Sequence, residues 1–172
     1  MKKEELLKIF SAYLPYGLTG KSSEYDSIDK LLGIYGTGGH TLTLCHRLSN
    51  NNSVDYECQS EEFTPVLYDL SYLTKEIEHE GRKFIPMHVL KNGGTDLNEY
   101  RLLEYKGYSA IDNEEHETCY EPDTMSFHQF YRGDSRMCTR QYQKFQKLLE
   151  WHFNVFQLPE DQFINKATLT NK

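Results

Sequence analysis

The segment SRMCTRQYQKFQKLLEWHFNVFQL, residues 135–158, is the longest periodic stretch of the chain. When successive residues are placed roughly 100° apart on a helix, its apolar side chains share one broad sector: Met137, Cys138, Tyr142, Phe145, Leu148, Leu149, His152, Phe153, Val155 and Phe156. The opposite sector holds polar side chains and one tryptophan: Arg136, Arg140, Gln143, Lys144, Lys147, Glu150, Trp151 and Asn154. The pattern predicts one long amphipathic helix over residues 135–158, which packs its apolar face onto the rest of the domain.

Shorter patterns upstream predict a small helix and a strand-rich middle. Apolar residues recur at helical spacing over residues 2–14, which indicates a short N-terminal helix. Three following segments are apolar or alternate between apolar and polar, with turn-forming residues between them. They predict an antiparallel meander, followed by a fourth strand: residues 31–35, 40–47, 54–58 and then 64–70.

The stretch that leads to the predicted long helix contains further turns. Glu80-Gly81 suggests a hairpin, Pro86 suits the first position of a short helix over residues 86–92, and aromatic density favours a second hairpin over 99–110. Residues 112–123 hold six carboxylates and no Lys or Arg. We expect them to form an acidic loop, and the polar residues 19–29 to form another loop.

Together these patterns predict an α+β fold with a single domain over residues 1–158. In this prediction a mostly antiparallel sheet packs against the long C-terminal helix and the short N-terminal helix. Residues 159–172 show no periodicity and are expected to form a C-terminal tail.

The composition narrows the class of protein. The net charge of −7 argues against general nucleic-acid binding, which relies on excess Lys and Arg, but leaves a local basic patch open. No apolar run reaches the roughly 20 residues of a membrane span, and Glu4 and Glu5 interrupt any secretory signal. The four cysteines are far apart without a CxxC motif and are expected to be reduced thiols. We therefore expect a cytoplasmic protein without a membrane partner or a cofactor.

The strongest metal candidates are His116, Cys119 and His128, with Cys138 further along the chain. Zinc takes four nitrogen or sulfur ligands, often in pairs at short spacing, and His116-x-x-Cys119 is one such pair. His128 and Cys138 are not paired in this way, and Cys138 falls on the apolar sector. Scattered structural histidines and cysteines are therefore the favoured interpretation, and no GxSxG motif points to a serine nucleophile.

A basic strip is the most distinctive feature of the predicted helix and the residues before it. It consists of Arg132, Arg136, Arg140, Lys144 and Lys147, with Trp151 at its C-terminal end. Arginines beside an aromatic ring can hold phosphates and stack a base, and they are also common anchors of protein interfaces. Three interpretations stay open: a solvated face, internal pairing with the acidic segment 112–123, and a surface for an external partner.

Two segments, LSYLTKEIEHEGRKFIP at residues 70–86 and KLLEWHFNVFQLPED at residues 147–161, carry a family resemblance. They are similar to small uncharacterised proteins encoded by phages and prophages of gut bacteria. In that family an L-x-x-L-T-K-E-I stretch is followed by a C-terminal E-W-H-F helix. The resemblance implies a mobile-element origin and the cytoplasm of a bacterial host, and it brings no activity with it.

Three hypotheses for function follow from the sequence. The first is a non-catalytic phage-type accessory protein that binds another protein, in one form a host nucleic-acid enzyme or a defence complex. The second is a metal-dependent enzyme that uses the His116, Cys119 and His128 cluster. The third is nucleic-acid binding through the basic strip.

Overall fold

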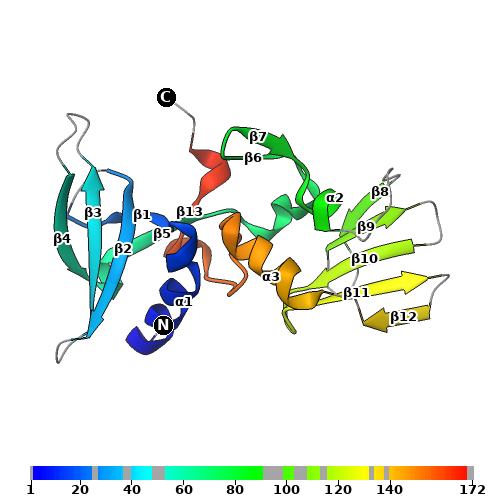
Figure 1. The fold of residues 1–172 in the computed structure, drawn as a ribbon, viewed down its shortest axis with the longest axis horizontal. Helices are drawn as coiled ribbons and strands as arrows, with labels where there is room; N and C mark the ends of the chain where they lie inside the picture. Colours follow the sequence, from blue (N-terminus) through cyan, green and yellow to red (C-terminus); the bar gives the residue numbers. More distant parts are fainter. Residues whose placement is uncertain are drawn as a thin grey trace. The chain divides into compact units, whose positions relative to one another are not determined.

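The computed structural model describes residues 2–24, 27–36, 40–47, 53–90, 99–102, 108–112, 116–131, 134–137 and 140–169. The chain divides into two compact units, of which unit 1 comprises Met1–Tyr68 and Leu158–Lys172 and unit 2 comprises Asp69–Gln157 (Figure 1). The mixed α+β class is confirmed. The expectation of one mostly antiparallel sheet is not met, because the described strands form sheets of six, five and two strands.

Unit 1 is built on the six-stranded sheet, with strand order β13-β5-β1-β2-β3-β4. All neighbouring strands are antiparallel except β13 and β5, which are parallel. Its elements are α1 (Lys3–Tyr13), η1 (Leu14–Tyr16), β1 (Thr19–Ser22), β2 (Asp29–Gly36), β3 (His40–Arg47), β4 (Ser53–Gln59), η2 (Ser60–Glu62), β5 (Phe63–Leu67), η4 (Glu160–Gln162), β13 (Ile164–Asn165) and η5 (Lys166–Thr168).

The predicted meander is confirmed as β2, β3 and β4, and the predicted fourth strand is β5. The expectation of a loop over residues 19–29 is wrong at its start, because β1 pairs with both β2 and β5. Residues 159–172, set apart in the sequence as a tail, contribute β13 to the sheet of unit 1.

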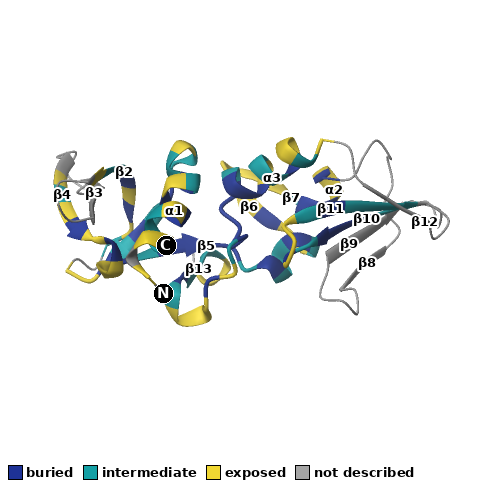
Figure 2. Ribbon diagram, turned by 90° about the horizontal axis from the view of Figure 1, so that it is seen from below, coloured by how far each residue is buried: buried dark blue, intermediate teal, exposed yellow. Residues whose placement is uncertain are grey.

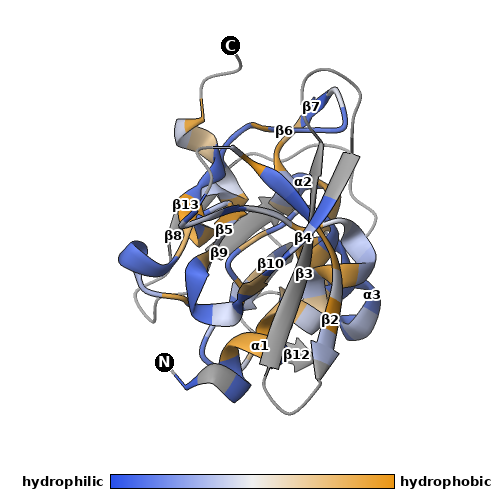
Figure 3. Cartoon of the chain, turned by 90° about the vertical axis from the view of Figure 1, so that its left-hand side faces the viewer, coloured by the Kyte–Doolittle hydropathy of each residue, from blue (hydrophilic) through white to orange (hydrophobic). Residues whose placement is uncertain are grey.

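The core of unit 1 joins the hydrophobic residues of α1, orange in Figure 3, to the buried strand β5 (Figures 2 and 3). Phe10 of α1 and Phe63 of β5 meet edge to face, with ring centroids 5.4 Å apart. The Phe63 ring lies against the backbone of Gly20, where a Cβ atom would be only 2.3 Å from a ring carbon. Glycine is therefore required at this position of β1, because any side chain would displace the ring.

Unit 2 contains the antiparallel five-stranded sheet β12-β11-β10-β9-β8 and the two-stranded sheet β6-β7. Its elements are η3 (Leu70–Thr74), β6 (Ile77–His79), β7 (Arg82–Phe84), α2 (Pro86–Leu90), β8 (Glu99–Leu102), β9 (Tyr108–Asp112), β10 (His116–Glu121), β11 (Ser126–Tyr131), β12 (Asp134–Met137) and α3 (Gln141–Glu150). In this unit α2 contacts η3 and β9, and α3 contacts β11.

Several expectations for unit 2 are confirmed, whereas those for the acidic segment and for the long helix are wrong. Glu80 and Gly81, with φ of 50° and 74°, form the turn between β6 and β7, and Pro86 begins α2. The second predicted hairpin is β8–β9. The acidic segment 112–123 is not a single loop, because half of it, His116–Glu121, forms β10, which pairs with β9 and β11.

The predicted long helix over residues 135–158 is wrong. Residues 134–137 form β12, which pairs with β11, and the helix itself spans only Gln141–Glu150. Arg140 has a left-handed backbone with φ of 62°, which an α-helix cannot contain. After α3, His152 and Gln157 are left-handed as well, with φ of 61° and 53°. Backbone reversals therefore end the helix at both sides, although the apolar periodicity continues.

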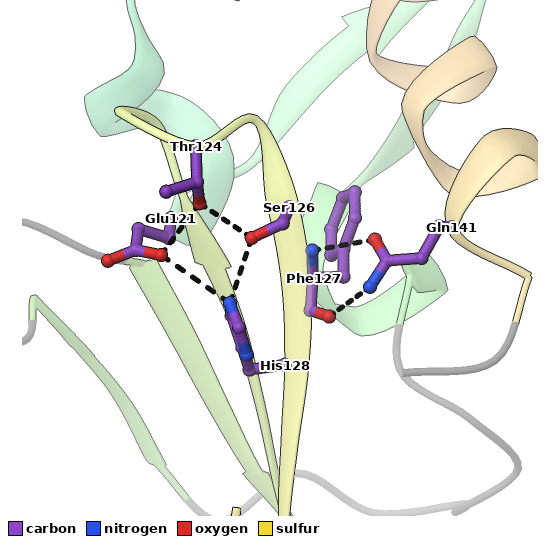
Figure 4. A network of polar contacts seen from close by, with 6 residues as sticks. All are labelled: Glu121, Thr124, Ser126, Phe127, His128 and Gln141. Atoms are coloured by element: carbon purple, nitrogen blue, oxygen red, sulfur yellow. Dashed lines mark hydrogen bonds and ion pairs between the residues drawn. The ribbon is translucent and has the colours of Figure 1, made fainter. Parts of the chain in front are cut away.

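The side chain of Gln141 explains why α3 begins where it does. Its Oε1 accepts a hydrogen bond of 2.7 Å from the backbone N–H of Phe127, and its Nε2 donates to the Phe127 carbonyl oxygen (Figure 4). The pairing of β12 with β11 extends over Tyr131 to His128, and Phe127 is the next residue of β11 beyond this pairing. The first residue of α3 therefore continues the hydrogen bonding of β11 and holds the helix against this strand.

Candidate functional site

The hairpin between β10 and β11 carries a network of four polar side chains (Figure 4). The hydroxyl of Thr124 donates to Glu121 Oε2 at 2.6 Å and lies 2.6 Å from the Ser126 hydroxyl. Ser126 Oγ lies 2.8 Å from His128 Nε2, and the same nitrogen is 3.4 Å from Glu121 Oε2. A serine, a histidine and a carboxylate are thus close together, as in a hydrolytic site.

The hydrogen count of this network argues against a serine nucleophile. Thr124 uses its one hydrogen on the carboxylate, so Ser126 must donate to Thr124. Ser126 then has only a lone pair for His128, whose Nε2 must carry a hydrogen. A base that activates a hydroxyl needs a lone pair at that nitrogen. The acid also lies near Nε2 rather than Nδ1, so the arrangement holds the hairpin turn instead of activating Ser126.

The predicted metal candidates do not assemble into a site among the described side chains. Cys119 and His128 are paired across β10 and β11, and Cys119 is fully buried. His116 begins β10, but its side chain lies outside the described part, as does all of Cys138. No group of three or more His, Cys, Asp or Glu is placed to hold a metal ion within the described residues. The His-x-x-Cys spacing that suits a turn falls in a strand, whose side chains alternate between faces.

The basic strip is not a continuous surface among its described members. Arg140 is exposed, but Lys144 is 6% exposed, although the helical projection places it on the polar side. The Lys144 ammonium donates to the carbonyl oxygen of Leu90 at the end of α2 and lies 5.6 Å from the centroid of the Phe127 ring. Its aliphatic stem and charge are therefore part of the core of unit 2. Arg132 and the side chain of Arg136 lie outside the described residues.

The two last residues of the strip, Lys147 and Trp151, do come together. Lys147 is exposed and pairs with Glu150, with Nζ 2.8 and 2.9 Å from its two carboxylate oxygens. Trp151 was expected on the polar side of the helix, but it is 5% exposed and packs against Phe84 of β7 at a centroid distance of 4.9 Å. The Trp151 ring therefore packs the end of α3 against the β6–β7 hairpin.

These contacts form one wall of a cavity of about 500 Å³ in unit 2. Nine residues from the hairpin, α2 and the end of α3 line it: His79, Glu80, Arg82, Lys83, Phe84, Val89, Lys147, Glu150 and Trp151. We call this space the unit 2 cavity. Trp151 is the only buried residue of this lining, whereas Val89 of α2 is 54% exposed. Behind it, the ring of buried His152 lies 6.0 Å from that of His79.

Some of the residues that line this cavity were singled out in the sequence. The hairpin turn at Glu80-Gly81 was predicted, and so were Lys147 and Trp151 as binding candidates. Arg82, Lys83 and Val89 were missed. Nothing in the local pattern links residues 79–89 to residues 147–151, because their proximity depends on long-range packing of the hairpin against α3.

Unit 1 holds a second polar cluster, around the buried carboxylate of Asp29. The Tyr56 hydroxyl donates to Asp29 Oδ2 at 2.5 Å, and Ser27 donates to both carboxylate oxygens at 3.1 and 3.2 Å. Burial raises the pKa of Tyr56 far above its usual value, and the hydrogen bond to Asp29 raises it further. Burial also raises the pKa of nearby Cys58 to about 12, with Glu62 and Glu24 adding to the effect. Both groups therefore stay protonated near neutral pH, which makes Cys58 a poor nucleophile.

Comparison with known proteins found no matching protein family, curated protein or solved structure. No helix among the described residues is both long and apolar enough to span a membrane.

Proposed function

We propose that the protein acts by binding another protein and that the unit 2 cavity is the contact site. The supporting observation is the combination of side chains around it: the exposed apolar Val89, the Phe84–Trp151 pair and the cations Arg82 and Lys83. Aromatic residues and arginine are enriched at protein interfaces and supply most of their binding energy.

The alternatives drawn from the sequence have less support. The metal-dependent enzyme lacks a ligand set among the described side chains. The nucleic-acid hypothesis depended on six residues, of which Lys144 and Trp151 are buried and Lys147 is paired with Glu150. In the phage setting that the resemblance implies, the proposed partner is a host protein such as a nucleic-acid enzyme or a defence complex.

The test is partner capture with a variant that changes the cavity without changing its charge. Wild-type protein and Val89→Gln are immobilised and exposed to bacterial host lysate at physiological salt. Burying a valine side chain contributes about 1.5 kcal/mol or more, which corresponds to roughly tenfold in affinity. We expect a protein retained by the wild type to be lost or strongly reduced with Val89→Gln.

Tyr142→Gln is the matched control, because Tyr142 is a 70% exposed apolar residue on α3 that does not line the cavity. It should retain the same partner as the wild type. The proposal fails if the wild type retains no specific protein, or if Val89→Gln and Tyr142→Gln retain the same proteins in the same amounts.

A further inference from the structure

We infer that the unit 2 cavity receives an acidic segment of the partner in which a carboxylate side chain stands next to an apolar one. This inference rests on the proposed function and adds the chemistry of the partner. It follows from which charged groups at the cavity are already paired and which are not.

The charges that line the cavity fall into two groups. On α3, Lys147 is neutralised by Glu150, whose two oxygens both contact its ammonium. On the hairpin, the side chains of Arg82 and Lys83 form no ion pair or hydrogen bond within the described part of the chain, and both are exposed. Two acids lie near them: Glu80 in the turn, and Glu78, which is paired with Lys83 across β6 and β7. Arg82, Lys83 and Lys147 line the cavity together with two carboxylates, Glu80 and Glu150, and the Arg82 guanidinium has no ion pair within the described part of the chain.

The hairpin holds these cations in a defined place. Arg82 is paired with His79 and Phe84 with Ile77 across β6 and β7, and the Phe84 ring rests on Trp151. A guanidinium on an ordered strand loses less conformational freedom when it binds, so it can bind a carboxylate in the bidentate geometry that arginine favours. The anionic group of the partner is therefore expected at Arg82.

The apolar part of the cavity specifies the neighbouring side chain of the partner. The exposed Val89 and the half-buried Phe84 offer apolar surface within the same cavity as Arg82. A purely phosphate-based ligand would leave this surface uncovered, whereas an acidic residue followed by an apolar one covers both parts. This is why an acidic protein segment is favoured over a nucleic-acid backbone.

Trp151 is the only tryptophan of the chain, so intrinsic fluorescence reports directly on the cavity. The probe is a short peptide that alternates glutamate and leucine, titrated into the full-length protein at low and at physiological salt. The same titration is made with a glutamine–leucine peptide and with single-stranded DNA. Three proteins are compared: wild type, Arg82→Glu/Lys83→Glu, and Lys8→Glu/Lys75→Glu. The last variant changes the net charge equally, at exposed lysines that do not line the cavity.

We expect the acidic peptide to change the Trp151 emission of the wild type and of Lys8→Glu/Lys75→Glu with equal affinity. The glutamine peptide and the Arg82→Glu/Lys83→Glu variant should each weaken binding at least tenfold. Equal binding of the two peptides, no effect of the charge reversal, or tighter binding of DNA would overturn the inference. If no peptide binds while Val89→Gln still abolishes partner capture, the acidic segment is wrong and the cavity remains the contact site. If partner capture fails as well, the proposed function falls with it.

Discussion

Ionisation of Cys58 provides a quantitative test of the core of unit 1. The thiol is 6% exposed in β4, and burial, followed by the charges of Glu62 and Glu24, raises its pKa from 9.0 to about 12. Over the interval between these values the native state keeps a proton that the unfolded chain has released. Because the unfolded state then binds fewer protons, the free energy of unfolding falls as pH rises. The contribution is complete below about pH 9 and is lost as the pH approaches about 12.

The expected magnitude follows from the size of this interval. One pH unit above 9 corresponds to about 1.4 kcal/mol, so the thiol's contribution falls by about 2 kcal/mol between about pH 8 and about pH 10.5. Cys58→Ala removes the titration and adds a cost for the lost sulfur that does not depend on pH. The stability difference between wild type and Cys58→Ala should therefore shrink by about 2 kcal/mol over this range.

The assay is urea unfolding of both proteins at the two pH values under reducing conditions, followed by circular dichroism. The two units need not unfold together, so the free energy of unfolding is taken from the transition that the substitution shifts. Leu67→Val is the control, because it trims a buried residue of the same unit without a titratable group. Its stability difference from the wild type should be the same at both pH values. If the stability difference between wild type and Cys58→Ala changes by less than about 0.5 kcal/mol between the two pH values, the inference that the native thiol is buried and stays protonated is refuted.

Three further predictions concern named contacts. Gly20→Ala should lower the stability of unit 1 by about 1–3 kcal/mol in thermal unfolding, because the new methyl group collides with the Phe63 ring; an unchanged midpoint would contradict that packing. Tyr56→Phe should cost about 1.5–3 kcal/mol, because the Asp29 carboxylate loses its 2.5 Å donor, and a double-mutant cycle with Asp29→Asn should show coupling. Nitrogen NMR at neutral pH should find hydrogen on Nε2 of His128, and a bare Nε2 would reopen the serine-nucleophile interpretation.

The strands of unit 1 could be predicted because their sequence reports directly on one buried face. In β4, Cys58 is buried while Glu57 and Gln59 are exposed, as the alternation in the sequence predicts, whereas β2 was predicted from its apolar run although Leu32 and Tyr35 are exposed. β1 was missed for the opposite reason. Its four residues, TGKS, have no apolar alternation, and Gly20 is present because the Phe63 ring occupies the space of a side chain.

The helix prediction failed because periodicity does not detect a backbone reversal. Arg140 has a left-handed backbone, which cannot be predicted from the type of amino acid at this position. This reversal separates β12 from α3. Lys144 shows a second limit. A lysine on the polar side of a projection is expected in water, but the carbonyl of Leu90 and the ring of Phe127 give its ammonium a buried environment. Leu90 and Phe127 both lie outside residues 135–158, so the local pattern holds no information about this environment of Lys144.

Trp151 is buried in the structure, whereas the sequence predicted it on an exposed helix face. This difference changes where a binding site is expected. As an exposed aromatic on a basic helix face, it would have been an anchor that contacts the partner by itself. Because it is buried against Phe84, it instead supports the hairpin that carries Arg82 and Lys83. Its removal should therefore disturb the cavity by loosening the hairpin, whereas substitution of the two cations should change recognition and leave the fold intact. The two kinds of substitution therefore distinguish a structural residue, Trp151, from residues proposed to contact the partner, Arg82 and Lys83.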